Sequence, residues 1–314
     1  MDRFGDDFCE AIELNISFVP LRGQTIEVLG QRLNQFLGIP YAEPPIGDLR
    51  FAKTKPIEEP RGGVIDATRP KSACLQDPNP NLPNQSEDCL FLNIWSPNDT
   101  TRLKPVMFFI HGGGLVGGSI YEAWYNGSAL AAHDIVLVTI QYRLGYFGFL
   151  YGNETSAPGN VGFHDQVLAL HWVRDNIDLF GGDKNRITIF GESAGSWSVS
   201  ALVLSPIAKG LFKRAILESG TIVWNKDRPP MTTEDALKEA KQLAQKVNCN
   251  DDKQWLQCLK NVNPKDIISE YKAANGIQFP TIGTEFLPLI PQKAFEQGLF
   301  NKGKLTNKVI LKNC

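Results

Sequence analysis

A serine between two glycines, in the run Gly-Glu-Ser-Ala-Gly at positions 191–195, is the most chemically distinctive stretch of the sequence. Residues 187–190 before it have strand character, and small and apolar residues at helical spacing follow it. A strand, a sharp turn and a helix together hold a serine hydroxyl away from its sheet, and the glycines let backbones approach closely. Ser193 is therefore a candidate nucleophile, at a helix N-terminus whose dipole favours developing negative charge. An ordinary glycine-rich turn is the alternative, and the strand and helix patterns on either side argue against it.

Three consecutive glycines, at positions 112–114, directly follow the apolar strand pattern of residues 106–110. Glycines there leave backbone N–H groups able to point at a substrate oxygen with no side chain in the way. Together with the N–H that follows the serine, they can form an oxyanion hole, for which we assign Gly113, Gly114 and Ala194. Read alone, three glycines are more often a flexible turn, and the preceding strand and the downstream serine favour the functional interpretation.

Composition places the chain among ordinary globular proteins. It has 314 residues, of which 42% are hydrophobic and 21% charged, with a formal net charge of −2. Residues 1–314 can bury a sizeable core, and we expect them to belong to one domain. The near balance of charge gives no reason to expect nucleic acid or an anionic membrane as a partner. No stretch approaches the roughly 20 apolar residues of a membrane-spanning helix, and residues 1–7 contain no signal-peptide core.

Cysteines and glycosylation sequons both favour the secretory pathway. Six cysteines include two locally spaced pairs, Cys74 with Cys89 and Cys249 with Cys258, each enclosing a polar, loop-like stretch. Five Asn-x-Ser/Thr sequons occur, at Asn15, Asn84, Asn98, Asn126 and Asn153. One sequon is weak evidence, but five of them with two plausible disulfide loops favour a secreted or lumenal glycoprotein. Because no signal peptide precedes them, we expect the N-terminus to be incomplete.

Apolar strand patterns and amphipathic segments alternate along the chain. Strand patterns cover residues 12–18, 25–28, 33–37, 90–95, 106–110, 135–140, 187–190 and 214–220. Apolar residues recur every three or four positions between 161 and 180, which predicts an amphipathic helix, and residues 233–260 also show a helical pattern. Continuous β-branched runs suit strands that are buried on both faces of a parallel sheet. The sequence predicts an α/β fold with a mostly parallel central sheet flanked by helices.

Several motifs resemble those of the type-B carboxylesterase and cholinesterase family. Residues 87–95, Glu-Asp-Cys-Leu-Phe-Leu-Asn-Ile-Trp, are similar to one family signature, and residues 190–196, Phe-Gly-Glu-Ser-Ala-Gly-Ser, to its active-site signature. The likeness extends over about residues 10–310. It implies an α/β-hydrolase fold and a serine esterase that hydrolyses carboxylic esters through an acyl-enzyme intermediate.

The resemblance also implies roles for residues outside the two glycine motifs. It implies disulfides Cys74–Cys89 and Cys249–Cys258 and ion pairs Arg50–Glu87 and Arg143–Asp165. By the same resemblance, Glu192 is a buried carboxylate behind the nucleophile and not the acid of the catalytic triad. The loop at residues 75–86 lacks the aromatic residue with which cholinesterases stack choline, which favours a general carboxylesterase. Trp224 lies where an acyl-pocket aromatic could be, although a buried core Trp is the commoner explanation.

The histidines depart from the family pattern. In an α/β-hydrolase the triad runs Ser, then Asp or Glu, then His along the chain. The four histidines, His111, His133, His164 and His171, all precede Ser193, and none lies where its general base is expected. The triad acid is also missing, so we expect the chain to be incomplete at its C-terminus. As it stands it should be nearly inactive, because removing triad members costs factors of about 10⁴–10⁶ in rate.

Two other hypotheses compete with an ester hydrolase. Members of such a fold that have lost catalytic partners can bind proteins instead, as an adhesion-type module, and a truncated inactive paralogue fits every residue. Ser193 and the intact glycine loop favour the enzyme, because a binding module has no use for a preorganised oxyanion hole. We predict a small ester as substrate, no cofactor and no metal, and the sequence does not indicate an oligomeric state.

Overall fold

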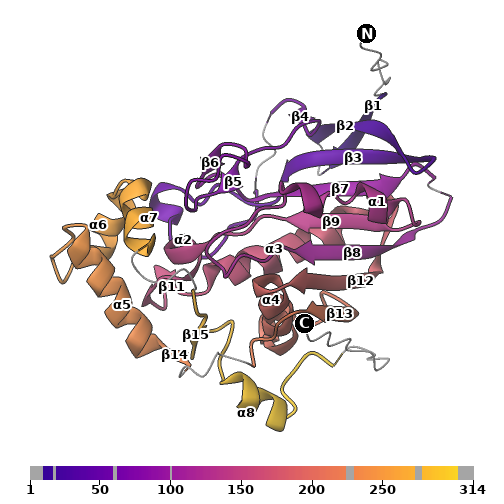
Figure 1. Cartoon of the computed structure of the whole chain (residues 1–314). Helices are drawn as coiled ribbons and strands as arrows, with labels where there is room; N and C mark the ends of the chain where they lie inside the picture. Colours follow the sequence, from indigo (N-terminus) through magenta and orange to yellow (C-terminus); the bar gives the residue numbers. More distant parts are fainter. Residues whose placement is uncertain are drawn as a thin grey trace.

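A nine-stranded mixed sheet runs through the centre of the computed structural model, which describes residues 10–16, 19–58, 62–99, 101–223, 230–272 and 278–302 (Figure 1). Its strands are β1 (Ala11–Ile16), β2 (Val19–Val28), β3 (Gln31–Pro40), β4 (Ile65–Asp66), β7 (Phe91–Pro97), β8 (Lys104–Ile110), β9 (Val136–Ile140), β12 (Gly182–Glu192) and β13 (Arg214–Glu218). Eight of them follow the order β1-β2-β3-β7-β9-β8-β12-β13, and β4 pairs with β2. The predicted α/β class is confirmed.

The direction of the strands divides this sheet into two parts. Strands β9, β8, β12 and β13 are parallel to one another, whereas β1, β2, β3, β7 and β9 are antiparallel from neighbour to neighbour. The sheet is therefore mixed rather than mostly parallel. An apolar strand buried on both faces has the same composition in either direction, so the sequence pattern could not tell them apart. The tight turn at Leu29 and Gly30, both with positive φ, makes β2 and β3 an antiparallel hairpin.

Eight α-helices and three short strand pairs complete the described parts. The helices are α1 (Ser128–Ala131), α2 (Gly145–Phe149), α3 (Val161–Asn176), α4 (Ala194–Leu204), α5 (Thr233–Lys246), α6 (Trp255–Asn261), α7 (Pro264–Lys272) and α8 (Pro291–Glu296). The strand pairs are β5 (Ala73–Cys74) with β6 (Gln85–Ser86), β10 (Tyr151–Asn153) with β11 (Ala157–Pro158), and β14 (Met231–Thr232) with β15 (Thr281–Ile282).

Both predicted helical segments are present, one of them interrupted. The helix predicted for residues 161–180 is α3 continued by the 3₁₀ turn Ile177–Phe180. The single helical pattern predicted for residues 233–260 is wrong in its continuity, because α5 ends at Lys246 and α6 begins at Trp255. The break falls where Asn248 adopts the left-handed conformation, with φ of 63°, that terminates many helices.

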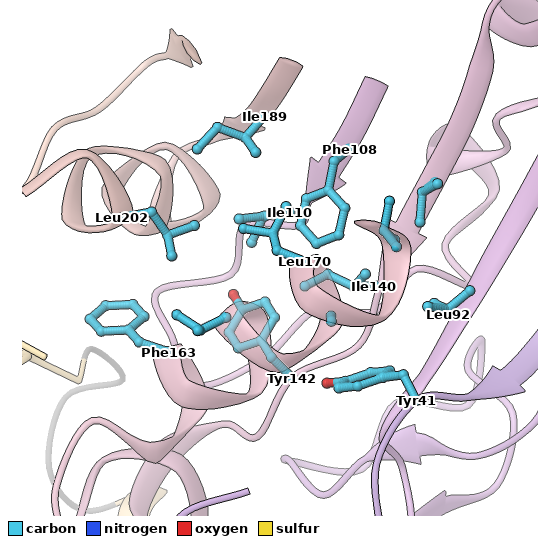
Figure 2. Packing of buried hydrophobic residues seen from close by; sticks show 14 of the residues in the cluster. Tyr41, Leu92, Phe108, Ile110, Ile140, Tyr142, Phe163, Leu170, Ile189 and Leu202 are labelled. Carbon is cyan, nitrogen blue, oxygen red and sulfur yellow. The ribbon is translucent and has the colours of Figure 1, made fainter. Parts of the chain in front are cut away.

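Side chains of the central strands alternate between two hydrophobic clusters, one on each face of the sheet. Phe108, Val138 and Ile94 belong to the larger cluster, which also contains residues of α3 and α4. Figure 2 shows part of this cluster, with Phe163 and Leu170 from α3 and Leu202 from α4 near the strand residues. The neighbouring strand residues Met107, Leu137 and Trp95 instead belong to a cluster that includes Ala131 of α1. This alternation is the period of two that a strand imposes. Packing on both faces holds the central strands in place, and the candidate site lies at the end of two of them, β8 and β12.

Helices α5, α6 and α7 pack around a third hydrophobic cluster, beside one end of the sheet (Figure 1). Its buried members include Phe147 of α2, Leu243 of α5, Trp255 and Leu259 of α6, and Ile267 of α7. The cluster therefore joins helices α5–α7 to the short helix α2, whose first residue, Gly145, donates its N–H to the carbonyl of Leu115, directly after the glycine loop.

Candidate active site

The turn between β12 and α4 holds Ser193 in a strained conformation. Ser193 has φ of 55° and ψ of −118°, and α4 begins at the next residue. Such a backbone is costly for a residue with a side chain, and it persists only where its neighbours hold it. Here the N–H of Ser193 donates to the carbonyl of Glu218 at 2.9 Å, and the N–H of Trp197 donates to the carbonyl of Ser193 at 3.0 Å. This is the strand, sharp turn and helix expected from the sequence.

The two glycines of the serine motif lie where side chains do not fit. A Cβ at Gly195 would lie 2.1 Å from the carbonyl oxygen of Ile110, the last residue of β8. A Cβ at Gly191 would lie 2.6 Å from that oxygen and also 2.6 Å from the carbonyl carbon of Gly195. The close approach predicted from the sequence is confirmed, and it presses the start of α4 against the end of β8.

The glycine loop after β8 lies against this turn. A Cβ at Gly112 would be 3.3 Å from the Cβ of Ser193. Gly113 and Gly114 have φ of 108° and 66°, in the region that favours glycine, and a Cβ at Gly113 would lie 2.2 Å from the carbonyl oxygen of Gly117. Within the described residues, the backbone N–H groups of Gly113, Gly114 and Ala194 donate no hydrogen bond. Gly113 and Gly114 belong to the loop whose first glycine approaches Ser193, so their N–H groups remain candidate donors of an oxyanion hole.

His111 is buried directly before the glycine loop. Its ring stacks on Tyr142 with centroids 4.5 Å apart, and its Nδ1 lies 2.8 Å from the carbonyl oxygen of Gly112. Because a carbonyl oxygen only accepts, Nδ1 carries the proton and Nε2 is the unprotonated nitrogen. Burial lowers the pKa of His111 to about 4, so this imidazole is neutral at neutral pH.

The other three imidazoles lie away from the serine. His164 is half-buried on α3 beside Phe286, and burial together with the nearby charge of Lys53 lowers its pKa to about 4. His133 and His171 are exposed. No hydrogen bond joins the hydroxyl of Ser193 to any histidine in the described part of the chain, which contains all four. The residues described here therefore supply the serine and the N–H donors but no general base.

Two carboxylates flank Ser193 at the carboxyl edge of the sheet. Glu192 and Glu218 are paired residues of the parallel strands β12 and β13. Partial burial raises the pKa of Glu192, and the charge of Glu218 raises it further. The expectation that Glu192 is buried is wrong, because its side chain is exposed at this open edge of the sheet. Its Oε2 lies over the glycine loop, 3.1 Å from where a Cβ of Gly112 would be.

The loop after β13 is a part of the site that sequence analysis missed. A Cβ at Gly220 would lie 2.9 Å from the carbonyl oxygen of Ser193, and Ser196 of α4 donates a short hydrogen bond to the carbonyl of Gly220. Glu218, in the same segment, accepts the N–H of Ser193. The only local signal was the run Glu-Ser-Gly at residues 218–220, where a strand pattern ends. This run does not indicate that the strand pairs with β12 and reaches Ser193.

A small, mostly apolar pocket opens at the first turn of α4. It is lined by Trp197, Ile222, Val223, Pro230, Met231, Phe279, Pro280, Ile282, Pro291 and Gln292. The backbone N–H of Trp197 donates to the carbonyl of Ser193, and the Trp197 indole stacks on Phe279 with centroids 6.2 Å apart, so one wall of the pocket comes from the helix that follows the serine. Trp224, assigned to an acyl pocket or the core from the sequence, lies outside the described residues.

The structural ties implied by the family resemblance are present. Disulfides join Cys74 to Cys89 and Cys249 to Cys258. The Arg50–Glu87 and Arg143–Asp165 ion pairs form at 2.6 Å and 2.7 Å, and both are largely shielded from solvent. Cys9 and Cys314, for which the sequence suggested no partner, lie outside the described residues.

Surface and charge features bear on cellular context. All five sequon asparagines are exposed, although Ser17 and Thr100, which complete two of the sequons, lie outside the described residues. Across the described ranges no helix combines the length and apolar character needed to cross a bilayer. The same ranges contain no group of three His, Cys, Asp or Glu side chains placed to hold a metal ion.

Comparison with known proteins places this site in a family. The carboxylesterase family matches residues 10–307, so the chain belongs to this family, whose fold is that of the α/β-hydrolases. It is 42% identical over 85% of its length to carboxylesterase 1D of Rattus norvegicus. It is 38% identical over 92% of its length to carboxylesterase 3 of Homo sapiens, and 37% identical over 94% to an acetylcholinesterase of Leptinotarsa decemlineata. The chain spans about half the length of these relatives, at 50%, 53% and 53%.

Proposed function

We propose that Ser193 is the nucleophile of a carboxylic ester hydrolase. Its hydroxyl oxygen attacks the ester carbonyl, and the oxyanion of the tetrahedral intermediate accepts hydrogen bonds from the N–H groups of Gly113, Gly114 and Ala194. The alcohol then leaves, and water hydrolyses the acyl-enzyme. The observation that carries the proposal is the set of three unused N–H groups beside a serine held at a positive φ. Each such donor is worth roughly 10²–10³ in rate.

The proposal requires a general base from outside these 314 residues. None of the four imidazoles contacts the Ser193 hydroxyl, and a serine without a base is a poor nucleophile. The greater length of the curated relatives supports a protein in which further residues complete the triad. Taken alone, the 314-residue chain is expected to hydrolyse esters about 10⁴-fold or more slowly than the completed protein.

The substrate we propose is a neutral ester rather than a choline ester. The pocket at the first turn of α4 is mostly apolar, and the loop enclosed by Cys74 and Cys89 has no aromatic residue. A quaternary ammonium group would therefore find no stacking ring in that loop. The relatives include both carboxylesterases and acetylcholinesterases, so this choice rests on the residues of this chain. Two disulfides and five exposed sequon asparagines support a secretory-pathway location.

Hydrolysis of a short-chain aryl ester by the product of the complete reading frame tests the proposal. Ser193→Ala should lower kcat by about 10⁴–10⁶, because it removes the nucleophile. Ser269→Ala is the control, since Ser269 is exposed on α7, away from the serine turn and the glycine loop. Full activity in Ser193→Ala would contradict the assigned nucleophile. A wild-type protein with no hydrolysis would instead support the competing binding module.

A further inference from the structure

The side chain of Gln76 joins the first disulfide loop to the glycine loop. Its Nε2 donates to the carbonyl of Gly118 at 2.8 Å, and its Oε1 accepts the N–H of the same residue at 2.9 Å. The Nε2 also donates to the carbonyl of Cys74 at 3.1 Å. Gln76 is buried, with 8% of its surface exposed. Because one backbone partner can only accept and the other only donate, these contacts define the orientation of the amide.

Gly118 is the residue through which this contact reaches the candidate oxyanion hole. It has φ of 97°, and a Cβ there would lie 2.4 Å from the carbonyl oxygen of Gly112. The loop closes on itself in the same region, because the N–H groups of Val116 and Gly117 donate to the carbonyl of Gly113 at 3.0 and 2.9 Å. A shift of Gly118 would therefore displace the peptides of Gly112 and Gly113 in the glycine loop.

We propose that Gln76 is a positioning residue that fixes the glycine loop in the geometry needed to bind an oxyanion. Any effect of this positioning on catalysis rests on the proposed esterase function. The Cys74–Cys89 disulfide anchors one end of the link, since Gln76 is two residues from Cys74 and bonds to its carbonyl. The disulfide loop thus acts as a fixed support for a loop whose glycines would otherwise allow many conformations.

Only an amide side chain satisfies both backbone groups of Gly118. In Gln76→Glu an acceptor replaces the Nε2 donor, which removes the bonds to the carbonyls of Gly118 and Cys74 and places a carboxylate against both oxygens. In Gln76→Met the volume is nearly preserved but no hydrogen bond remains, and the Gly118 peptide loses both partners. The two variants should therefore loosen the same loop by different routes.

Amide hydrogen exchange of residues 111–120 tests the proposal without reference to catalysis. In the wild type, the Gly118 amide should exchange more slowly than those of Gly113 and Gly114, which donate to no described residue. Gln76→Met and Gln76→Glu should each speed exchange in this segment by about five- to tenfold, the usual effect of a lost hydrogen bond. Gln35→Met is the control, because Gln35 on β3 is equally buried at 8% and its side-chain amide also forms a hydrogen bond, with Oε1 accepting from Nε2 of Gln24 at 2.6 Å.

The control should leave exchange in residues 111–120 unchanged. Fast exchange of the wild-type Gly118 amide, or an unchanged loop in both Gln76 variants, would overturn the proposal, and the wild-type measurement stands even if a variant does not fold. In the product of the complete reading frame, both variants should lower kcat and kcat/KM together, with KM unchanged, because an oxyanion exists only in the transition state. Because exchange is measured without a substrate, loss of the esterase proposal would leave this test intact.

Discussion

The imidazole of His111 is held in one protonation state by its surroundings. Its side chain is fully buried, Nδ1 bonds to the Gly112 carbonyl, and Nε2 has no hydrogen-bond partner among the described residues. A proton on Nε2 would place a charge in an apolar environment, so the pKa falls to about 4. At the scale of single residues, His111 is thus a neutral support beneath the glycine loop and is unsuited to act as a base for Ser193.

This burial predicts a pH dependence of stability. The folded-state pKa of about 4 lies below the ordinary value of about 6.5, so the unfolded chain binds the proton first as the pH falls. The contribution of His111 is complete above pH 6.5 and is lost progressively as the pH falls towards 4. The loss should amount to about 2–3 kcal/mol in the free energy of unfolding. His164, whose pKa is also lowered to about 4, changes stability in the same direction.

Urea unfolding at several pH values between about 7 and about 4.5 measures this effect. His111→Gln should make the free energy of unfolding less dependent on pH over this range, because it removes one titrating group. His133→Gln, at an exposed position, should keep the wild-type dependence. If His111→Gln and the wild type lost stability in parallel, the burial argument for His111 would fail.

At the scale of elements, the site depends on how β8, β12 and α4 meet. The glycines that separate these elements leave no room for a methyl group, with Gly195 facing the carbonyl of Ile110 at the end of β8. Pressing α4 against β8 brings the serine and the glycine loop together. The positive φ of Ser193 is therefore maintained by packing between elements rather than by its own preference.

Gly195→Ala should consequently destabilise the whole fold. The added Cβ would lie 2.1 Å from a backbone oxygen, so β8 and α4 must separate, and we expect a loss of about 3 kcal/mol or more in the free energy of unfolding. Gly62→Ala is the control, since no atom lies within 4 Å of its Cβ position and its φ is not in the positive region. The control should change stability by less than about 1 kcal/mol. Urea denaturation of both variants measures the difference, and an equal, small effect would refute the packing argument.

The sequence predicted the elements better than their arrangement. Strands β8, β9 and β12 were recognisable because their apolar runs are continuous, and that continuity follows from burial on both faces. The same burial hides strand direction, so the antiparallel pairing of β7 with β3 and with β9 was not foreseen. The end of α5 was missed because the apolar helical spacing continues beyond Lys246. The helix ends there because the backbone of Asn248 adopts a left-handed conformation, which the spacing of apolar residues does not reveal.

At the scale of the whole molecule, the local parts of the site were predictable and its long-range contacts were not. The serine motif and the glycine loop are short strings whose backbone requirements are visible in sequence. Gln76 and Glu218 contact the site from other segments of the chain. A glutamine in a loop or a glutamate at the end of a strand is common, and the sequence does not indicate which residue it contacts. The exposure of Glu192 depends on which segments cover the carboxyl edge of the sheet, and the sequence of strand β12 alone does not predict them.

The central sheet and its helices hold the proposed nucleophile and the proposed oxyanion-binding loop side by side. The central strands and α4 position Ser193, while the first disulfide loop supports the glycine loop through Gln76. The chain spans about half the length of its curated relatives, and in the described residues none of its four histidines forms a hydrogen bond with the Ser193 hydroxyl. The account therefore predicts that Ser193 becomes reactive when a base from outside these residues is present.

Covalent labelling of the protein from its natural source by a fluorophosphonate probe tests this prediction at Ser193 itself. Such probes react with activated serine nucleophiles, so we expect one adduct, found by mass spectrometry on the tryptic peptide of residues 187–209 that contains Ser193. The isolated 314-residue chain should react about 10⁴-fold more slowly. If the peptide from the natural protein remained unmodified while a reference esterase in the same sample was fully labelled, Ser193 would not be an activated nucleophile and the esterase account would be contradicted.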